Sequence, residues 1–233
     1  MANYLITGVS RGVGHALALR LIAAGHRVYG VARGSVPDLA LAGVAQLELT
    51  DFDAYPAALA HLLAEVRSLD GLIHSAGIVR PGALADQDST AFTEQFAINV
   101  TAAAELVRHW LPALRPAGGT VVLVNSGSGL NARPPLSAYG ASKFALRGYA
   151  EALRQEEPSL RVCTVYPGRI DTTMQRAVRA AEAGEYRGAD YLRPETVAGV
   201  IASVLDLPRD ATITDITVRP ASQPSPSSPD TVA

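Results

Sequence analysis

A tyrosine and a lysine stand four positions apart in the segment SAYGASK, residues 137–143. The segment opens a stretch of helical periodicity that runs to about Glu156, and residues four apart on a helix share one face. A cation beside a phenol favours the phenolate, so Lys143, together with the positive charge of an oxidised cofactor, could bring the pKa of Tyr139 from about 10 toward about 7.5. Such a tyrosine can transfer a proton near neutral pH. The same spacing is common on exposed helices that do no chemistry, so the surrounding elements decide its meaning.

Three glycines follow the first apolar run, in the segment TGVSRGVG, residues 7–14. At a strand-to-helix turn, glycines permit a tight turn, a close approach of the backbone to a ligand and close packing of the helix on the sheet. The helix N-terminus then faces an anion. The loop predicts a site for the diphosphate of a dinucleotide, although glycine is also favoured in any strained turn.

The same loop also fits G-x-S-x-G, the nucleophile turn of an α/β-hydrolase, at Gly8 to Gly12. That chemistry requires an acid and then a histidine later in the chain. The last of the five histidines is His109, and the turn would fall on the first strand, with no sheet before it. The sequence therefore favours dinucleotide binding over hydrolysis.

The end of the second apolar run indicates which dinucleotide is bound. An NAD site places a carboxylate roughly 20 residues after the glycines, where it holds the ribose 2′-hydroxyl. Here Ala32 and Arg33 stand in that place, and Arg11 lies inside the glycine loop. Two guanidinium groups suit a 2′-phosphate, so we expect NADP(H) rather than NAD(H). The alternative is that both arginines are solvated loop residues.

Seven short β-branched or aliphatic runs alternate with longer stretches of helical periodicity. The runs are Tyr4 to Ile6, Arg27 to Ala32, Val44 to Leu49, Gly71 to His74, Thr120 to Asn125, Arg161 to Tyr166 and Ile213 to Val218. This alternation predicts a Rossmann-like α/β fold, a doubly wound parallel seven-stranded sheet with helices on both faces and ligands at the carboxyl ends of the strands. We expect a single domain over residues 1–221 and a disordered Pro- and Ser-rich tail over residues 222–233.

The composition is that of an ordinary globular protein. Of 233 residues, 48% are hydrophobic, and the net charge of −2 offers no positive field for nucleic acid. No apolar run is long enough to span a bilayer, and the N-terminus has no basic segment followed by a long apolar stretch. The lone Cys163 cannot form an internal disulfide, which favours a reducing compartment. We therefore expect a cytoplasmic protein without nucleic-acid, membrane or metal partners.

Taken together, these motifs resemble those of the short-chain dehydrogenase/reductase family, over nearly the whole length from Tyr4 to about Pro220. TGVSRGVG is similar to the family's T-G-x-x-x-G-x-G, and SAYGASK to its Y-x-x-x-K. Ser126 stands thirteen residues before the tyrosine, where the family's catalytic serine is usual. FAINV supplies Asn99 at the position of the fourth catalytic residue. Residues 166–172, YPGRIDT, resemble the family's P-G-x-V-x-T segment.

The resemblance implies reversible hydride transfer between a nicotinamide cofactor and a small-molecule carbonyl or alcohol. Ser126 and Tyr139 would bind the substrate oxygen, with Tyr139 as general acid and base. Lys143 would lower the phenol pKa and hold the nicotinamide ribose, while Asn99 would hold a water that links Lys143 to solvent. A homodimer or homotetramer is usual in the family, and residues 91–114 and 137–156 carry apolar side chains on more than one face. The alternative is a catalytically silent NADP(H)-sensing binding protein.

The residues that the motifs place at the cofactor share positions just after predicted strands or on the Tyr–Lys helix. They are Gly8, Ser10, Arg11, Gly12, Val13, Gly14, Arg33, Glu48, Leu49, Ser75, Ala76, Gly77, Tyr139, Lys143, Pro167, Gly168, Ile170 and Thr172. The sequence departs from the family at two of these places. The family's N-N-A-G is His74-Ser75-Ala76-Gly77 here, and we interpret His74 as structural. The family's D-V after the third strand is Glu48-Leu49 here.

Three segments should determine the substrate: residues 78–82, 130–136 and 172–193, the last of which we expect to form a lid. Arg169 could receive a substrate carboxylate or simply face solvent. The sequence does not identify the substrate.

Overall fold

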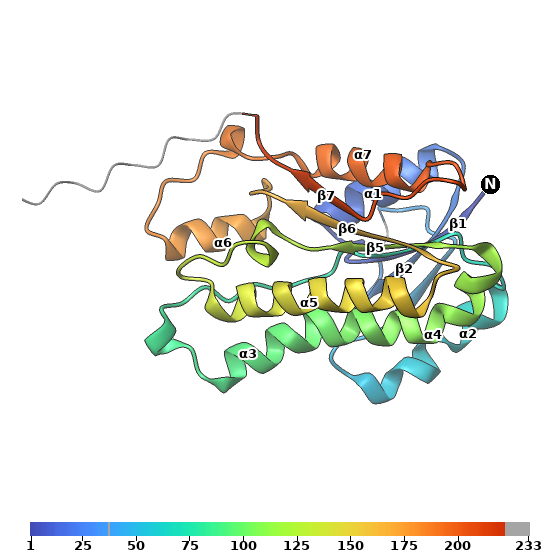
Figure 1. Cartoon of the computed structure of the whole chain (residues 1–233), viewed down its shortest axis with the longest axis horizontal. Coiled ribbons are helices and arrows are strands. Elements are labelled where there is room, and N and C mark those ends of the chain that lie inside the picture. The colour runs from blue at the N-terminus through green and yellow to red at the C-terminus, as the bar shows by residue number, and fades with distance from the viewer. Residues whose placement is uncertain (37, 222–233) are drawn as a thin grey trace, which may run out of the picture.

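The computed structural model describes residues 1–36 and 38–221, so the expected tail at residues 222–233 lies outside the described residues. The chain forms a parallel seven-stranded sheet in the order β3-β2-β1-β4-β5-β6-β7 (Figure 1). The strands are β1 (Asn3–Thr7), β2 (Arg27–Ala32), β3 (Gly43–Gln46), β4 (Gly71–His74), β5 (Thr120–Val124), β6 (Arg161–Pro167) and β7 (Asp215–Val218). The predicted fold class is confirmed.

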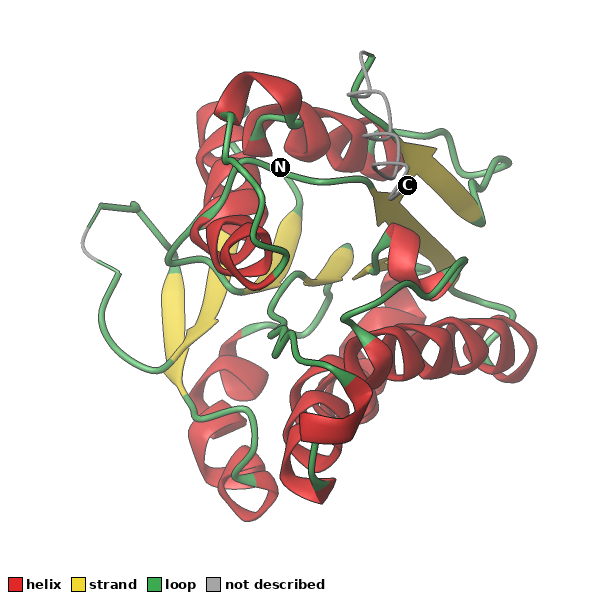
Figure 2. Cartoon of the chain, turned by 90° about the vertical axis from the view of Figure 1, so that its left-hand side faces the viewer, coloured by secondary structure: helices red, strands yellow, loops and turns green. Residues whose placement is uncertain are grey.

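Helices cover both faces of this sheet (Figures 1 and 2). The helices are α1 (Gly12–Ala23), α2 (Tyr55–Glu65), α3 (Ser89–Phe96), α4 (Ala102–Ala117), α5 (Ser137–Glu156), α6 (Thr173–Ala181) and α7 (Pro194–Leu205). Helices α1 and α7 pack together on one face, and α2, α4 and α5 lie on the other. Within the described residues, no helix has the length and hydropathy needed to cross a membrane.

The first strand shows why the sheet is buried on both faces. Leu5 points into the core under α2, α4 and α5, whereas Tyr4 and Ile6 point into the core under α1 and α7. Successive side chains of a strand point to opposite faces, so a strand covered on both sides must be apolar throughout. All three side chains are at most 5% exposed. The apolar runs of the sequence therefore mark the strands well.

Three predicted strands are longer than the observed ones, and one of them, β5, ends at Val124, one residue before the predicted Asn125. The run Val44 to Leu49 forms a strand only as far as Gln46, because its partner β2 ends at Ala32, which pairs with Gln46. Glu48 and Leu49 lie beyond this ladder. The last strand begins at Asp215 rather than Ile213.

The helical stretch from residue 91 to residue 114 is not one continuous α-helix. It contains the end of α3, a π-helical turn over Ala97–Thr101, and most of α4. A π turn inserts one extra residue into a helix and is often found at functional sites. Asn99, a predicted site residue, lies in this turn and is completely buried.

Candidate active site

The predicted site residues gather at one edge of the sheet. Because the strands are parallel, their carboxyl ends share this edge, where β1, β4, β5 and β6 stand side by side. The glycine loop follows β1, the segment Ser75–Gly77 follows β4, Ser126 follows β5, and Gly168 follows β6. Tyr139 and Lys143 lie in the first turns of α5, which is preceded by the serine loop. The structure thus brings the separate motifs of the sequence to one place.

Each of the three loop glycines occupies a position that a larger residue would strain or crowd, or where the backbone is open to a ligand. Gly8 and Gly12 have φ angles of +71° and +63°, which favour glycine. A Cβ on Gly14 would lie 2.5 Å from the Gly8 carbonyl oxygen, so α1 packs against β1 only without it. A Cβ on Gly12 would meet only the Thr172 methyl group, at 3.6 Å. Gly12 is thus the point where a ligand can approach the backbone.

The side chains of the glycine loop differ in exposure. Ser10 and Arg11 are exposed, whereas Val13 is buried in the core under α1 and α7. Arg33, after β2, is also exposed, and its Nη1 atom lies 3.8 Å from a carboxylate oxygen of Glu48. This ion pair is long, and its side chains are 76% and 48% exposed, so it holds Arg33 only weakly.

Asn99 is held by hydrogen bonds on both sides of its side-chain amide. Its Nδ2 donates to the Ile78 carbonyl oxygen and to Ser142 Oγ, each at 3.0 Å, and its Oδ1 accepts from the Ile78 N–H at 2.9 Å. A Cβ on Gly77 would lie 3.1 Å from Asn99 Oδ1 and 3.8 Å from Lys143 Nζ. The glycine therefore leaves room between this amide and the lysine.

Ser126 is positioned by a residue that the sequence analysis missed. The buried Asn125 accepts from the Ser126 N–H at 2.8 Å and donates to the Lys143 carbonyl oxygen at 3.0 Å. It thus ties the serine loop to α5. The sequence did contain a sign of this role, because Asn125 is a polar residue at the end of an otherwise apolar run. The Ser126 hydroxyl accepts from the Ser128 N–H at 3.1 Å.

Tyr139 and Lys143 share one face of α5, as their spacing predicts, and Lys143 Nζ lies 5.8 Å from the centre of the phenol ring. The ammonium group donates to the Val124 carbonyl oxygen at 3.0 Å. Burial lowers the pKa of Lys143 to about 8. Burial also raises the pKa of Tyr139, and the nearby Ser126 hydroxyl opposes that rise. The lowering of the phenol pKa that we expect from Lys143 together with an oxidised cofactor stays a prediction; within this chain alone, desolvation outweighs the effect of Ser126.

The segment after β6 approaches the glycine loop. Pro167 ends the strand, and the Gly168 N–H donates to the Val218 carbonyl oxygen at 2.7 Å. Ile170 then pairs with Leu192, so residues 171–191 form a long loop whose two ends lie side by side. Thr172, near the start of this loop, caps α6: its Oγ1 atom accepts from the Gln175 N–H at 3.3 Å.

Ion pairs stabilise the loop of residues 171–191. Arg169 donates to both carboxylate oxygens of Glu182, at 2.8 and 2.9 Å, and Arg179 donates to the same carboxylate. Tyr186 donates to Asp171. Arg169 is 44% exposed, in agreement with its interpretation as a solvent-facing residue. The sequence did not indicate its pairing with Glu182, because that partner is 13 residues away and reaches it only through the turn of the chain.

His74 is fully buried, in agreement with its interpretation as a structural residue. Burial and the nearby charge of Lys143 lower its pKa to about 3, so the ring is neutral near pH 7. Within residues 1–36 and 38–221, no three His, Cys, Asp or Glu side chains are grouped so that they could hold a metal ion.

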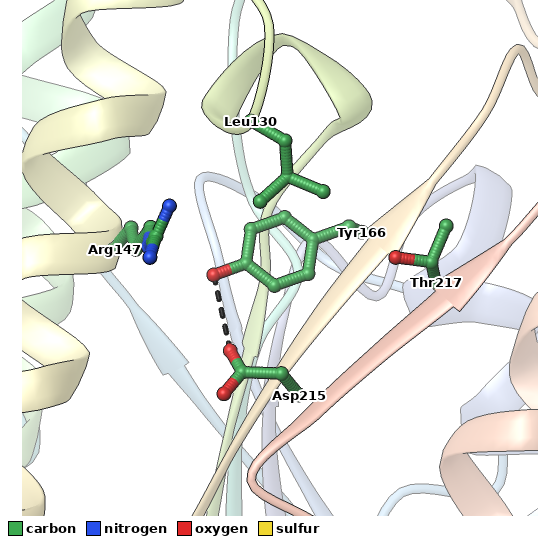
Figure 3. A pocket seen from close by; sticks show the side chains of 5 residues that line it. All are labelled: Leu130, Arg147, Tyr166, Asp215 and Thr217. Atoms are coloured by element: carbon green, nitrogen blue, oxygen red, sulfur yellow. Dashed lines mark hydrogen bonds between the residues drawn. The ribbon is translucent and has the colours of Figure 1, made fainter.

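A cavity of about 300 Å³ lies between α5 and the edge strand β7 (Figure 3). It is lined by Leu130, Arg147, Tyr166, Asp215 and Thr217, and Tyr166 donates to Asp215 at 3.1 Å. Only Leu130 belongs to a segment expected to determine the substrate. The cavity is thus distinct from the cluster of predicted catalytic residues.

A parallel sheet that carries a glycine cradle after its first strand defines the class of doubly wound, nucleotide-binding α/β proteins. A family model described as short chain dehydrogenase matches residues 2–183 of the sequence. The chain belongs to the short-chain dehydrogenase/reductase family of oxidoreductases.

Individual relatives match over nearly the full chain. A 2,3-dihydro-2,3-dihydroxybenzoate dehydrogenase of Escherichia coli K12 is 31% identical, over 93% of this chain and 94% of its own. A benzil reductase ((S)-benzoin forming) of Saccharomyces cerevisiae is 30% identical, over 86% of this chain and 89% of its own. The fold is similar to that of an alcohol dehydrogenase from the archaeon Thermococcus sibiricus complexed with 5-hydroxy-NADP, with a TM-score of 0.86 and 21% identity, covering 96% and 98% of the two chains.

Proposed function

We propose that this protein transfers a hydride between NADP(H) and a small-molecule carbonyl or alcohol, with Tyr139 as general acid and base. The carrying observation is that Ser126, Tyr139 and Lys143 converge at the edge of the sheet that also bears the glycine cradle. The cofactor, when bound, supplies the hydride, and the protein supplies position and charge.

The protonated form of Tyr139 is the one that carbonyl reduction requires. Its raised pKa means that the phenol keeps its proton at neutral pH. It can then donate this proton to the oxygen of a carbonyl substrate, while the Ser126 hydroxyl forms a second hydrogen bond to the same oxygen. In the reverse reaction, the phenolate would accept the proton of the alcohol.

Lys143 and Asn99 would support this proton transfer. With a pKa of about 8, Lys143 is mostly charged at pH 7 and can hold the ribose hydroxyls next to the nicotinamide. The room left by Gly77 between Asn99 and Lys143 suits a water that links the lysine to solvent.

The preference for NADP(H) would come from Arg11 and Arg33. Both guanidinium groups are exposed beside the glycine loop, where the 2′-phosphate of NADP(H) would lie. We expect Arg33→Ala to lower the ratio of NADPH to NADH affinity about tenfold, the loss of one charge-assisted contact. Arg27→Ala, at the opposite end of the same strand, is the control. An unchanged ratio in Arg33→Ala would contradict the assignment.

The substrate is proposed to be an apolar or aromatic carbonyl compound. Leu84, Leu130 and Met174 come from the segments after β4, β5 and β6, and their side chains are 73%, 39% and 39% exposed. Exposed apolar side chains at the ligand edge of the sheet suit an apolar substrate. The name of one relative, a benzil reductase, points to the same class, because benzil is a diaryl diketone.

A panel of ketones, aldehydes, quinones and benzil, assayed by NADPH consumption, tests this function. We expect Tyr139→Phe to lower turnover at least about 100-fold while NADPH binding is retained. Tyr29→Phe, which removes a hydroxyl bonded to Glu65 away from the site, is the control. Tight NADPH binding without turnover of any panel member would instead favour a cofactor-sensing binding protein.

We also propose that the protein is a homodimer or homotetramer. A groove between α4 and α5 is lined by Val107, Leu111 and Tyr149, among others, and Phe144 on α5 is 43% exposed. Sedimentation equilibrium should show more than one copy per particle, and Phe144→Glu should shift the distribution toward the monomer. A parent protein that stays monomeric at micromolar concentration would contradict this.

A further inference from the structure

His74 joins two elements that carry different parts of the site. Its Nδ1 atom lies 3.2 Å from Thr7 Oγ1, at the end of β1, and its Nε2 atom lies 3.3 Å from the Ile98 carbonyl oxygen in the π turn. Thr7 directly precedes the glycine loop, and Ile98 directly precedes Asn99. One buried side chain therefore links the strand of the cofactor cradle to the turn that positions Asn99.

The hydrogen bonds of Thr7 determine where the proton of this ring lies. Thr7 Oγ1 accepts from the Ser75 N–H at 3.1 Å and from the Ala76 N–H at 3.0 Å. A hydroxyl has two lone pairs and one proton, so the remaining contact, to His74 Nδ1, must use the hydroxyl as donor. Nδ1 then carries no proton. The proton of the neutral ring is on Nε2, which donates to Ile98.

The path continues from the π turn into the helix that bears Tyr139. Asn99 Nδ2 donates to Ser142 Oγ at 3.0 Å, and Ser142 donates to the Tyr139 carbonyl oxygen at 2.8 Å. His74, Asn99 and Ser142 are each 0% exposed. A break in this buried path leaves a polar group without a partner, so the path restricts the positions of the elements it connects.

We infer that His74, as its Nε2–H tautomer, is a positioning residue that fixes the π turn of Asn99 relative to the cofactor cradle. The expected changes in kcat given below rest on the proposed function. An asparagine, the residue of the N-N-A-G pattern, reaches only as far as Nδ1. The imidazole spans the whole distance from Thr7 to Ile98.

Two variants separate the two halves of this bridge. The Oδ1 atom of asparagine is as many bonds from Cα as His74 Nδ1, and the Nε2 atom of glutamine as many as His74 Nε2. His74→Asn should therefore keep the bond from Thr7, with an NADPH Kd within about twofold of the parent value and kcat lowered about tenfold. His74→Gln should keep the bond to Ile98, with kcat near the parent value and Kd raised about tenfold.

A residue that only fills space would not produce this reciprocal pattern. Ile201→Val, in the core under α7, measures how much Kd and kcat respond to lost packing alone. Equal changes of Kd and kcat in both histidine variants, or no change beyond that of Ile201→Val, would overturn the inference.

Nitrogen NMR of the ¹⁵N-histidine-labelled protein tests the tautomer without any substrate. The signal that disappears in His74→Asn belongs to His74. It should show a protonated Nε2 and an unprotonated Nδ1, unchanged from pH 7 to pH 5. A proton on Nδ1, or a ring that titrates in this range, would overturn the inference. Because this spectrum and the NADPH Kd need no turnover, they remain decisive even if the proposed reaction fails.

Discussion

Lys143 is the only lysine in the sequence, and the fold leaves it 3% exposed. A buried ammonium is costly unless its environment replaces water, and here one carbonyl oxygen, that of Val124, accepts from it. Its pKa of about 8, against an ordinary value of 10.5, corresponds to a cost of about 3 kcal/mol for keeping the charged form inside the folded protein. The role that we propose for Lys143 in the reaction would therefore come at the expense of stability.

Replacing this lysine should stabilise the fold. We expect Lys143→Met to raise the free energy of unfolding at pH 7 by about 2 kcal/mol, after allowing for the lost hydrogen bond to Val124. The unfolded chain binds the proton more tightly between pH 8 and 10.5, so the parent protein gains stability as pH rises through this range. The advantage of the variant should shrink accordingly.

Urea unfolding at pH 7 and pH 10 measures this difference, and Lys143→Arg, which keeps a charge, is the control. A methionine variant that is less stable than the parent at pH 7 would show that burial of the ammonium is not costly. The direction of this effect follows only from the structure. The sequence predicted that Tyr139 and Lys143 share a face, but spacing along a helix contains no information on how deeply that face is buried.

At the scale of elements, the contact between α1 and β1 depends on Gly14. A methyl group there would lie 2.5 Å from the backbone oxygen of Gly8, closer than any real contact, and backbone cannot move aside cheaply. We expect Gly14→Ala to lower the free energy of unfolding by about 3 kcal/mol and to abolish NADPH binding. The measurements are urea unfolding and quenching of protein fluorescence by NADPH.

Gly199→Ala is the matched control for this variant. Gly199 also lies within a helix, α7, and a Cβ there would meet only the tip of Arg20, at 4.0 Å. Because glycine inside a helix is unfavourable, this substitution should stabilise the protein by about 0.5–1 kcal/mol. If both variants had the same effect, close packing of α1 on β1 would not be the role of Gly14.

The positions of helices, strands and loops could be predicted where a short stretch of sequence alone determines the local structure. The seven strands were found from their apolar runs, because the five inner strands are buried on both faces. The glycine loop was found from three residues with fixed roles. The π turn was not predictable, because Asn99 bonds to Ile78, 21 residues earlier, and no local pattern marks that contact. The pairing of Arg169 with Glu182 was missed for the same reason.

At the scale of the whole molecule, His74 should make the protein sensitive to acid. Its pKa of about 3 in the folded state lies below the ordinary value of 6.5, so the unfolded chain binds the proton more tightly between these values. Stability is therefore fully present above pH 6.5 and is lost as pH falls toward 3. We expect a loss of about 2 kcal/mol from this group between pH 7 and pH 5.

Thermal unfolding at pH 7 and pH 5, compared with His74→Asn, isolates this contribution. The variant has no group that titrates at this position, so its stability should fall less over the same interval. Equal losses in the two proteins would show that other groups cause the acid sensitivity.

The single, inward-facing lysine also has a practical consequence. Reagents that acylate ε-amino groups can react with only one side chain in this sequence, that of Lys143. The other basic residues counted with it are arginines, which these reagents do not modify. Since that target is shielded, acylation at this position proceeds only when the molecule momentarily opens around it. The rate of acylation, followed by mass spectrometry, therefore measures how often the edge of the sheet that carries the candidate active site opens. This measurement does not require the substrate to be known.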